Sequence, residues 1–274
     1  MTAAGEQVQR RAAAEAPLRG PAARQAAIAE HVLAEGSLSA AELAERFQVS
    51  QMTIHRDLDE LERQGIVRKF RGGVTAQPSG VFESNVVYRM KSMQAEKDAV
   101  AARALELIEP GMAVMLDDST TALALARRLA EGVITPLTVV TNYMAGLNLL
   151  SKARGIRLMA VGGDYDLSHD SFLGVSCVEA VTSLSVDLCF VSTAAVSGGF
   201  AYHQEQHIVA VKRAMLDAAA RNVLLLDHTK LGKVALHRLA ALSVFERVLV
   251  DAGASPDHLR DLEEHKVNYE VAGS

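Results

Sequence analysis

The pattern of apolar positions changes once along the chain. From residue 22 to residue 64, apolar side chains recur at helical spacing, and after residue 93 they gather in short continuous runs. On the third predicted helix, Ile54, Leu58 and Leu61 fall on one face. Gly36 and Gly65 are placed to end the first and third helices. The helices are expected over about Ala22–Ala34, Ala40–Phe47 and Gln51–Gln64.

The later part of the chain alternates between β-rich runs and helical stretches. Two of the helical stretches are Thr121–Ala130 and Gln206–Ala220. Nearly continuous apolar strands that alternate with helices predict an α/β domain with a mostly parallel sheet covered on both faces. The strands are expected over Ala113–Leu116, Leu137–Thr141, Arg157–Val161, Asp187–Val191, Asn222–Leu226, Arg247–Val250 and Lys266–Glu270.

These patterns divide the chain into four parts. Residues 1–20 are expected to form a flexible tail, and residues 21–76 a winged helix-turn-helix domain whose wing is the segment Ile66–Val74. Residues 77–92 contain Pro78, Ser79 and Gly80 and few periodic apolar positions, which predicts a linker. Residues 93–274 form the α/β domain.

Composition and charge say less about the class of protein than the pattern of apolar positions does. The net charge is −5, and the first 80 residues carry ten basic and ten acidic side chains, so total charge does not indicate a nucleic-acid partner. No apolar run reaches the roughly 18 residues of a membrane helix. The two cysteines, Cys177 and Cys189, provide no disulfide framework and no zinc site. We expect them to be core residues of a cytoplasmic protein.

The local placement of polar residues in the first domain does indicate DNA binding. Ser39 and Glu42 form a capping box before the second helix, and Ser50 caps the third. Two short helices joined by a tight turn, with polar residues at the start of the second, are typical of a recognition helix in the major groove. A capped hairpin or a charged turn can each be purely structural, but their combination favours double-stranded DNA. The residues expected to contact DNA are Ser39, Ser50, Gln51, Thr53, His55, Arg56 and, on the wing, Arg68, Lys69 and Arg71.

The same residues resemble a known family. Arg24, Ile28, Val32 and the segment Ser50–Leu58 resemble the helix-turn-helix signature of the DeoR family of bacterial regulators. The wing Gly65–Gly73 is also similar, with Arg71 where the family often has histidine. The resemblance implies a sequence-specific transcriptional regulator, expected to be a repressor of carbohydrate metabolism. Because recognition helices must meet two half-sites, a homodimer or homotetramer is expected.

In that family the second domain resembles the fold of ribose-phosphate isomerases and CoA-transferases, and the resemblance spans about residues 88–270. The matching motifs lie in the expected order: Glu96–Lys97, Asp117–Thr121, Val140–Asn142, Val161–Asp164, Phe172–Gly174, Lys212–Met215 and Asp227–Gly232. The resemblance implies an effector site for a phosphorylated sugar. Its expected residues are Asp117, Asp118, Ser119, Thr120, Thr121, Thr141, Asn142, Gly162, Gly163, Asp164, Lys212, Asp227 and Lys230.

These residue types suit such a ligand. The segment Ser119–Thr121 offers hydroxyl and N–H groups at a helix N-terminus, where phosphate binds readily. Lys212 and Lys230 can neutralise a phosphate. Asp117, Asn142 and Asp164 can take sugar hydroxyls, and Gly162–Gly163 would let a ligand approach the backbone. Taken alone, each feature can also occur without a ligand. The hydroxyl residues can form a helix cap, the glycines a turn, and the lysines solvated charges.

Two details of this chain leave the effector open. Ser119 stands where the family commonly has glycine, and Asp118 adds negative charge beside the expected phosphate position. A DNA-binding regulator with a non-sugar effector is therefore an alternative. His203 and His207 are four residues apart on an expected helix start, but no third ligand is close in sequence. We predict no metal and no cofactor, with His203 either on an exposed helix face or lining the ligand site.

A sugar-phosphate isomerase is the second alternative. Asp117, Asp118 and Lys212 could supply an acid and a base. However, the runs Asp-Gly-Ala-Asp-Glu and Lys-Gly-Gly-Gly-Gly that we associate with ribose-phosphate isomerases are missing from the sequence. Kinship of fold does not carry activity. We therefore predict a regulator and not an enzyme.

Overall fold

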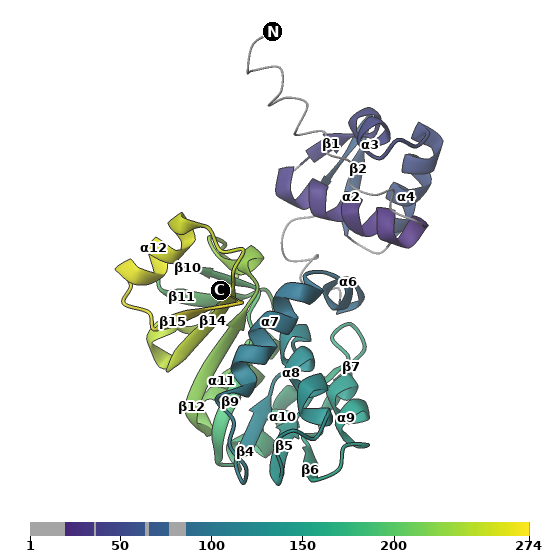
Figure 1. Cartoon of the computed structure of the whole chain (residues 1–274). Helices are drawn as coiled ribbons and strands as arrows, with labels where there is room; N and C mark the ends of the chain where they lie inside the picture. The colour runs from purple at the N-terminus through teal and green to yellow at the C-terminus, as the bar shows by residue number, and fades with distance from the viewer. Residues whose placement is uncertain (1–19, 36, 64–65, 77–85, 274) are drawn as a thin grey trace. The chain divides into compact units, whose positions relative to one another are not determined.

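The computed structural model describes residues 20–35, 37–63, 66–76 and 86–273 (Figure 1). Most of the expected tail, the helix stops Gly36 and Gly65, Gln64, and residues 77–85 of the expected linker lie outside the described residues. The chain divides into two compact units, residues 1–82 and 83–274. Every helix in the described ranges is too short or too polar to cross a lipid bilayer.

The first unit contains the three predicted helices and a three-stranded antiparallel sheet. Its elements are α2 (Pro21–Glu35), β1 (Ser37–Ser39), α3 (Ala40–Arg46), α4 (Gln51–Arg63), β2 (Val67–Phe70) and β3 (Gly73–Ala76). The sheet order is β1-β3-β2, so the wing strands β2 and β3 pair with each other and β1 joins the free edge of β3. The unpredicted strand β1 leads directly into the capping box, in which Glu42 N–H donates to Ser39 Oγ at 3.1 Å.

The second unit is built on a seven-stranded sheet in the order β15-β14-β12-β9-β4-β5-β6. All neighbouring strands in it are parallel. This confirms the predicted fold class. The strands are β4 (Ala113–Leu116), β5 (Leu137–Thr141), β6 (Ile156–Ala160), β9 (Val186–Val191), β12 (Ala219–Leu226), β14 (Arg247–Asp251) and β15 (Tyr269–Ala272).

Helices cover both faces of this sheet (Figure 1). They are α6 (Val86–Lys91), α7 (Gln94–Leu105), α8 (Thr120–Ala130), α9 (Met144–Leu150), α10 (Gly174–Thr182), α11 (Gln206–Asp217) and α12 (Pro256–Glu264). Helices α7, α8 and α9 share one apolar core with Val114 and Val223, whereas α10, α11 and α12 share another with Met115 and Leu224. Adjacent strand residues enter opposite cores because side chains alternate across a strand.

Several small elements complete the second unit. The hairpin β7 (Asp164–Asp166) and β8 (Ser171–Leu173) is antiparallel. A second antiparallel sheet joins β10 (Ala195–Ser197), β11 (Phe200–His203) and β13 (His237–Ala241). The short 3-10 turns are η1 (His228–Lys230) and η2 (Leu242–Val244).

The structure corrects several predictions, beginning with two boundaries. The helix expected to reach Ala220 ends at Asp217, because Ala219 already pairs with Val186 in the sheet and tertiary pairing overrides the helix propensity of alanine. The last strand starts at Tyr269, because Lys266 has a left-handed φ of 55°.

Two further corrections concern the residues expected to form a linker and those expected to start a helix. The interval 77–92 contains helix α6, which belongs to the second unit. His203 and His207 do not share a helix. His203 ends strand β11, whose neighbour there is His237 on β13, and His207 is the second residue of α11.

Candidate functional site

The N-terminal end of α4 presents polar side chains to solvent. Gln51, His55 and Arg56 are exposed, and Thr53 is half-buried. Ser50 holds this end of the helix, because its Oγ accepts a hydrogen bond from Thr53 N–H at 3.2 Å and lies 2.9 Å from Thr53 Oγ1. The side chains of Ser50 and Thr53 therefore hydrogen-bond to each other at the start of the helix. The exposed side chains of Gln51, His55 and Arg56 lie at the end of the helix that would enter a groove.

The wing offers two exposed cations and one that is already engaged. Arg68 and Arg71 are exposed. Lys69 instead forms an ion pair with Asp59 of α4, and its backbone N–H donates to Glu62 Oε1 at 2.8 Å. At the wing tip, a Cβ on Gly73 would lie 2.6 Å from the carbonyl oxygen of Leu38, so the close contact with β1 requires glycine.

A pocket lies at the carboxyl ends of the central strands of the second unit. The chain runs outward from β4 to β5 and β6, returns to β9 on the other side of β4, and continues to β12, β14 and β15. The crevice at such a reversal is where open α/β sheets bind ligands. The pocket is lined by Arg89, Lys97, Asp118, Ser119, Thr120, Thr121, His169, Ser192, Thr193, Ala194, His203, Ile208, Lys212, Asp227 and Lys230.

The N-terminus of α8 forms one wall of this pocket. Ser119 is the N-cap, and its Oγ accepts from Ala122 N–H at 3.0 Å. Within the described residues, no acceptor binds the N–H groups of Thr120 or Thr121. These N–H groups carry the positive end of the helix dipole, so this wall suits an anion.

Lys212 lies at the base of the pocket in a buried charge cluster. Its Nζ contacts the carboxylate of Asp117 and lies 3.1 Å from Asp118 Oδ1. Burial alone would lower the pKa of Lys212, but the two carboxylates outweigh it and raise that pKa. Burial likewise raises the pKa of Asp118, but the charge of Lys212 holds it well below its usual range. Lys212 and Asp118 are therefore charged, and the carboxylates of Asp117 and Asp118 already pair with Lys212.

Three further cations come from different elements. Arg89 lies on α6, Lys97 on α7 and Lys230 on η1. Arg89 Nε is buried and has no hydrogen-bond partner among the described residues. Lys97 Nζ donates to the carbonyl oxygens of Arg89 and Ser92, at 2.5 and 2.9 Å. With Lys212, the four cations face the carboxylates of Asp118 and Asp227 on the lining and Asp117 behind it.

Two histidines also line the pocket. Burial first, and then the charge of Lys212, lower the pKa of His203 to about 3, so His203 is neutral at physiological pH. His203 Nδ1 accepts from Glu205 N–H at 3.3 Å. Burial lowers the pKa of His169, but its contacts with Glu205 and Asp166 outweigh burial and raise it. On the pocket lining, the four Lys and Arg side chains outnumber the two carboxylates of Asp118 and Asp227.

Comparison with known proteins assigns both units. The DeoR-like helix-turn-helix domain matches residues 24–79, and the DeoR C terminal sensor domain matches residues 92–252. The chain belongs to the DeoR family.

Several bacterial regulators of known sequence match most of this chain. The "Uncharacterized HTH-type transcriptional regulator YgbI" of Escherichia coli K12 is 32% identical over 92% of this chain and 98% of its own length. The glycerol-3-phosphate regulon repressor of the same organism is 28% identical over 90% and 98%. The HTH-type transcriptional repressor GlcR of Bacillus subtilis 168 is 30% identical over 83% and 87%. These relatives are regulators, so this chain is a DNA-binding transcriptional regulator with a sensor domain and not an enzyme.

Solved structures similar to this chain include two proteins of other functions. Ribose 5-phosphate isomerase A from Methanocaldococcus jannaschii is 18% identical, with a TM-score of 0.36 over 51% of this chain and 53% of that one. The eIF2B delta protein from Chaetomium thermophilum is 13% identical, with a TM-score of 0.45 over 90% and 94%.

Not every residue expected at the effector site of this DeoR-family protein borders the pocket. Asp117 lies directly behind it, where its Oδ2 accepts from Ser192 N–H at 2.7 Å. Thr141 Oγ1 accepts from Tyr143 N–H, and Asn142 Nδ2 donates to the carbonyl of Phe172 at 2.8 Å. Both of these side chains therefore hold the loop after β5.

Gly162, Gly163 and Asp164 also lie away from the pocket lining, at the connection from β6 to β7. A Cβ on Gly163 would lie 2.4 Å from the carbonyl oxygen of Leu173. This glycine therefore permits close approach of the protein's own backbone.

Sequence reasoning missed several lining residues of the sensor domain. Lys97 belongs to the Glu96–Lys97 motif that carries the family resemblance. Ser192 and Thr193 directly follow β9, so the expectation that loops after parallel strands line the ligand site could have identified these two residues. His169 lies in a turn between two three-residue strands. Arg89 lies in the segment that was expected to be a linker. Neither position carries a periodic signal.

Proposed function

We propose that this DeoR-family regulator is a repressor of carbohydrate-metabolism genes whose DNA affinity changes when a phosphorylated sugar binds the pocket of the second unit. One observation carries the proposal. The open N–H groups of Thr120 and Thr121 at the start of α8 share a pocket with Arg89, Lys97 and Lys230. A helix N-terminus together with cationic side chains is a strong site for a phosphate.

The rest of the lining suits a sugar. Ser192 and Thr193 offer hydroxyl groups, and neutral His203 can donate or accept a hydrogen bond. Ionised Asp118 and Asp227 can accept from sugar hydroxyls. A relative named for the glycerol-3-phosphate regulon lends support to a phosphorylated polyol or sugar as the effector class.

The first unit supplies the DNA contacts in this proposal. Gln51, Thr53, His55 and Arg56 of α4 would read base edges or phosphates in the major groove. Arg68 and Arg71 of the wing would contact phosphates, with a smaller share for Lys69 because Asp59 already pairs with it. Ser39 and Ser50 would serve mainly as helix caps.

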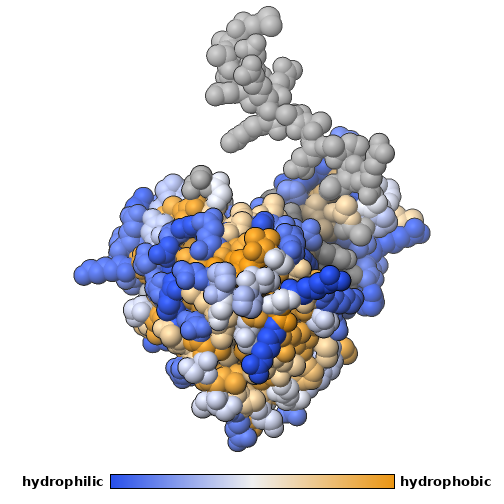
Figure 2. Space-filling model, turned by 60° about the horizontal axis from the view of Figure 1, so that its bottom comes forward, coloured by the Kyte–Doolittle hydropathy of each residue, from blue (hydrophilic) through white to orange (hydrophobic). Residues whose placement is uncertain are grey.

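Two half-sites on the operator would need a homodimer or homotetramer. Large apolar side chains reach the surface of the second unit, among them Leu167, Val175 and Leu236. Figure 2 shows hydrophobic areas among the hydrophilic ones on the face that it draws. Self-association would cover part of this apolar surface. The effector would then act by preferring one arrangement of the subunits over another.

The decisive experiment is fluorescence anisotropy of the full chain on labelled DNA from upstream of its own gene. The titration is repeated at one stated salt concentration with a panel of sugar phosphates and, as matched controls, the same sugars without phosphate. We expect one phosphorylated compound to shift the binding curve several-fold while its unphosphorylated counterpart leaves the curve unchanged. Tight DNA binding that no phosphorylated sugar alters would overturn the effector assignment, and absence of specific DNA binding would overturn the proposal as a whole.

A further inference from the structure

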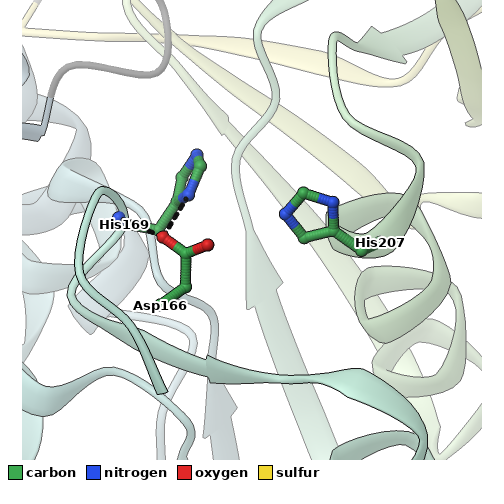
Figure 3. Close-up of side chains that lie close together, drawn as sticks. All are labelled: Asp166, His169 and His207. Atoms are coloured by element: carbon green, nitrogen blue, oxygen red, sulfur yellow. Dashed lines mark hydrogen bonds and ion pairs between the residues drawn. The ribbon is translucent and has the colours of Figure 1, made fainter. Parts of the chain in front are cut away.

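A cluster of imidazoles and carboxylates lies beside the pocket. Asp166 ends β7, His169 lies in the turn that follows, and His207 is the second residue of α11. Figure 3 shows the three side chains pointing toward one another from these two segments. One ligand atom from each lies within 4.8 Å of the other two. Glu205, the N-cap residue of α11, borders both histidines.

Glu205 contacts both histidines through their Nε2 atoms, whereas Asp166 contacts the other ring nitrogen of His169. Asp166 Oδ1 lies 3.1 Å from His169 Nδ1, Glu205 Oε1 lies 3.1 Å from His169 Nε2, and Glu205 Oε2 lies 3.2 Å from His207 Nε2. Around a tetrahedral ion with bonds of roughly 2.0–2.1 Å, ligand atoms are about 3.3 Å apart. Small side-chain rotations would bring His169 Nε2, His207 Nε2 and a carboxylate oxygen of Glu205 around one ion.

His169 supplies an independent sign of a missing ligand. Its side chain is only 3% exposed, and its Nε2 has no hydrogen-bond partner among the described residues. Glu205 Oε1 lies 3.1 Å from Nε2 and can pair with it electrostatically, but the contact does not have the geometry of a hydrogen bond. A buried nitrogen left in this state is costly. A metal ion would satisfy it, while Asp166 accepts the proton of Nδ1, which is the usual way in which a carboxylate orients a ligating histidine.

We propose that His169, His207 and Glu205 bind a divalent transition-metal ion of the Zn²⁺ class, and that Asp166 orients the His169 ring. Two imidazoles with carboxylates suit Zn²⁺, Co²⁺ or Ni²⁺, whereas Mg²⁺ and Ca²⁺ prefer oxygen ligands. His207 is 47% exposed, which gives the ion access from solvent. In the sequence, the histidine nearest to His207 is His203. The fold instead brings His169 beside His207 from a separate segment.

Such an ion would connect two walls of the pocket. His169 lines the pocket from the β7–β8 turn, and Ile208 and Lys212 line it from α11. The ion would fix the turn to the start of that helix. This inference does not depend on the proposed effector, because metal binding can be measured without DNA and without a sugar phosphate.

The test is calorimetric titration of ZnCl₂ into the full chain, prepared without an affinity tag and freed of metal by dialysis against a chelator. We expect one ion per chain with a dissociation constant in the micromolar range or below. His207→Gln and Asp166→Asn should each weaken binding at least tenfold. His207 is half exposed, so its variant is expected to fold. MgCl₂ should give no binding at this site.

His265→Gln is the matched control. His265 is also partly exposed and lies 3.4 Å from a carboxylate, that of Asp261, but it is outside the metal-ligand cluster. This variant should bind Zn²⁺ as the wild type does. Titration with CoCl₂ gives a second readout, because Co²⁺ in a tetrahedral site with imidazole ligands shows a visible absorption band that His207→Gln should abolish. Unchanged Zn²⁺ binding in His207→Gln would overturn the proposal. The absence of Zn²⁺ binding by the wild type at a ZnCl₂ concentration of about 100 µM, roughly 100 times the expected dissociation constant, would also overturn it.

Discussion

Arg24 of α2 and Asp57 of α4 form a two-pronged ion pair. Arg24 Nε donates to Asp57 Oδ2 at 2.6 Å and Nη2 donates to Oδ1 at 3.3 Å. Gln25 Nε2 donates to the same carboxylate at 3.0 Å. The Asp57 side chain is 4% exposed and that of Arg24 is 15% exposed. The pair fixes the rotation of α4, so that Asp57 faces inward while Gln51 and Arg56 face solvent.

Removing this carboxylate should destabilise the first unit. We expect Asp57→Ala to lower its free energy of unfolding by about 3 kcal/mol, because Arg24 would keep a largely buried charge without a partner. Hydrogen exchange of the α4 amides measures this unit separately from the second one. Glu60→Ala is the control, since it removes a carboxylate that pairs with Arg63 on the exposed side of α4 and should cost less than about 0.5 kcal/mol. Equal effects of the two substitutions would show that the Arg24–Asp57 pair does not fix α4.

The sequence predicts best those elements whose signal is continuous and local. Ala113–Leu116 and Leu137–Thr141 are strands with the predicted bounds, because fully buried parallel strands are unbroken apolar runs. The position of Ser119–Thr121 on the pocket wall follows from the same reasoning, since loops after parallel strands meet at one edge of the sheet.

Other features depend on contacts that sequence spacing does not encode. Helix α6 is too short to show a periodic pattern, so Arg89 reaches the pocket from a segment that reads as a linker. The inward rotation of Asp57 depends on a residue on another helix, Arg24. His169 and His207 meet only because the β7–β8 turn packs beside the start of α11. Each of these is a tertiary relationship between segments far apart in the chain.

Two of the three basic positions of the wing should respond differently to substitution. Arg71 is exposed, whereas Asp59 already pairs with Lys69. Each phosphate contact contributes about 0.9 to the slope of log affinity against log salt concentration. We therefore expect Arg71→Ala to reduce that slope by about 0.9 and Lys69→Ala to reduce it clearly less. Fluorescence anisotropy on operator DNA at several salt concentrations measures both slopes, and equal reductions would contradict the difference in pairing.

Lys230 and Lys233 give a matched pair for testing the pocket. Lys230 lines the pocket, and Lys233, three residues later, is exposed outside it. We expect Lys230→Met to weaken the effective sugar phosphate at least tenfold, because a charge-assisted hydrogen bond contributes roughly 1.5–3 kcal/mol. Lys233→Met makes the same change of charge and should leave the affinity unchanged. Calorimetric titration of the ligand measures both, and similar losses in the two variants would indicate a general effect of charge rather than a contact in the pocket.

His203 should make the stability of the second unit depend on pH. Its pKa is about 3 in the folded protein, because burial and then the charge of Lys212 disfavour the protonated ring, whereas an unfolded histidine has a pKa near 6.5. Between these values the unfolded chain binds one more proton than the folded chain at this residue. The contribution of His203 to stability therefore falls as the pH falls from about 6.5 toward 3, by on the order of 1 kcal/mol per pH unit.

His203→Asn isolates this effect. Asparagine does not titrate, and its side-chain oxygen can still accept a hydrogen bond, as His203 Nδ1 does from Glu205 N–H. We expect the stability of the variant to fall less than that of the wild type between pH 6.5 and pH 4.5, as measured by chemical denaturation at each pH. His169, whose raised pKa acts in the opposite direction, is present in both proteins, so most of its contribution is common to the two pH profiles. Parallel pH profiles would mean that the pKa of His203 is the same in the folded and unfolded chains, so that burial and Lys212 do not disfavour the protonated ring.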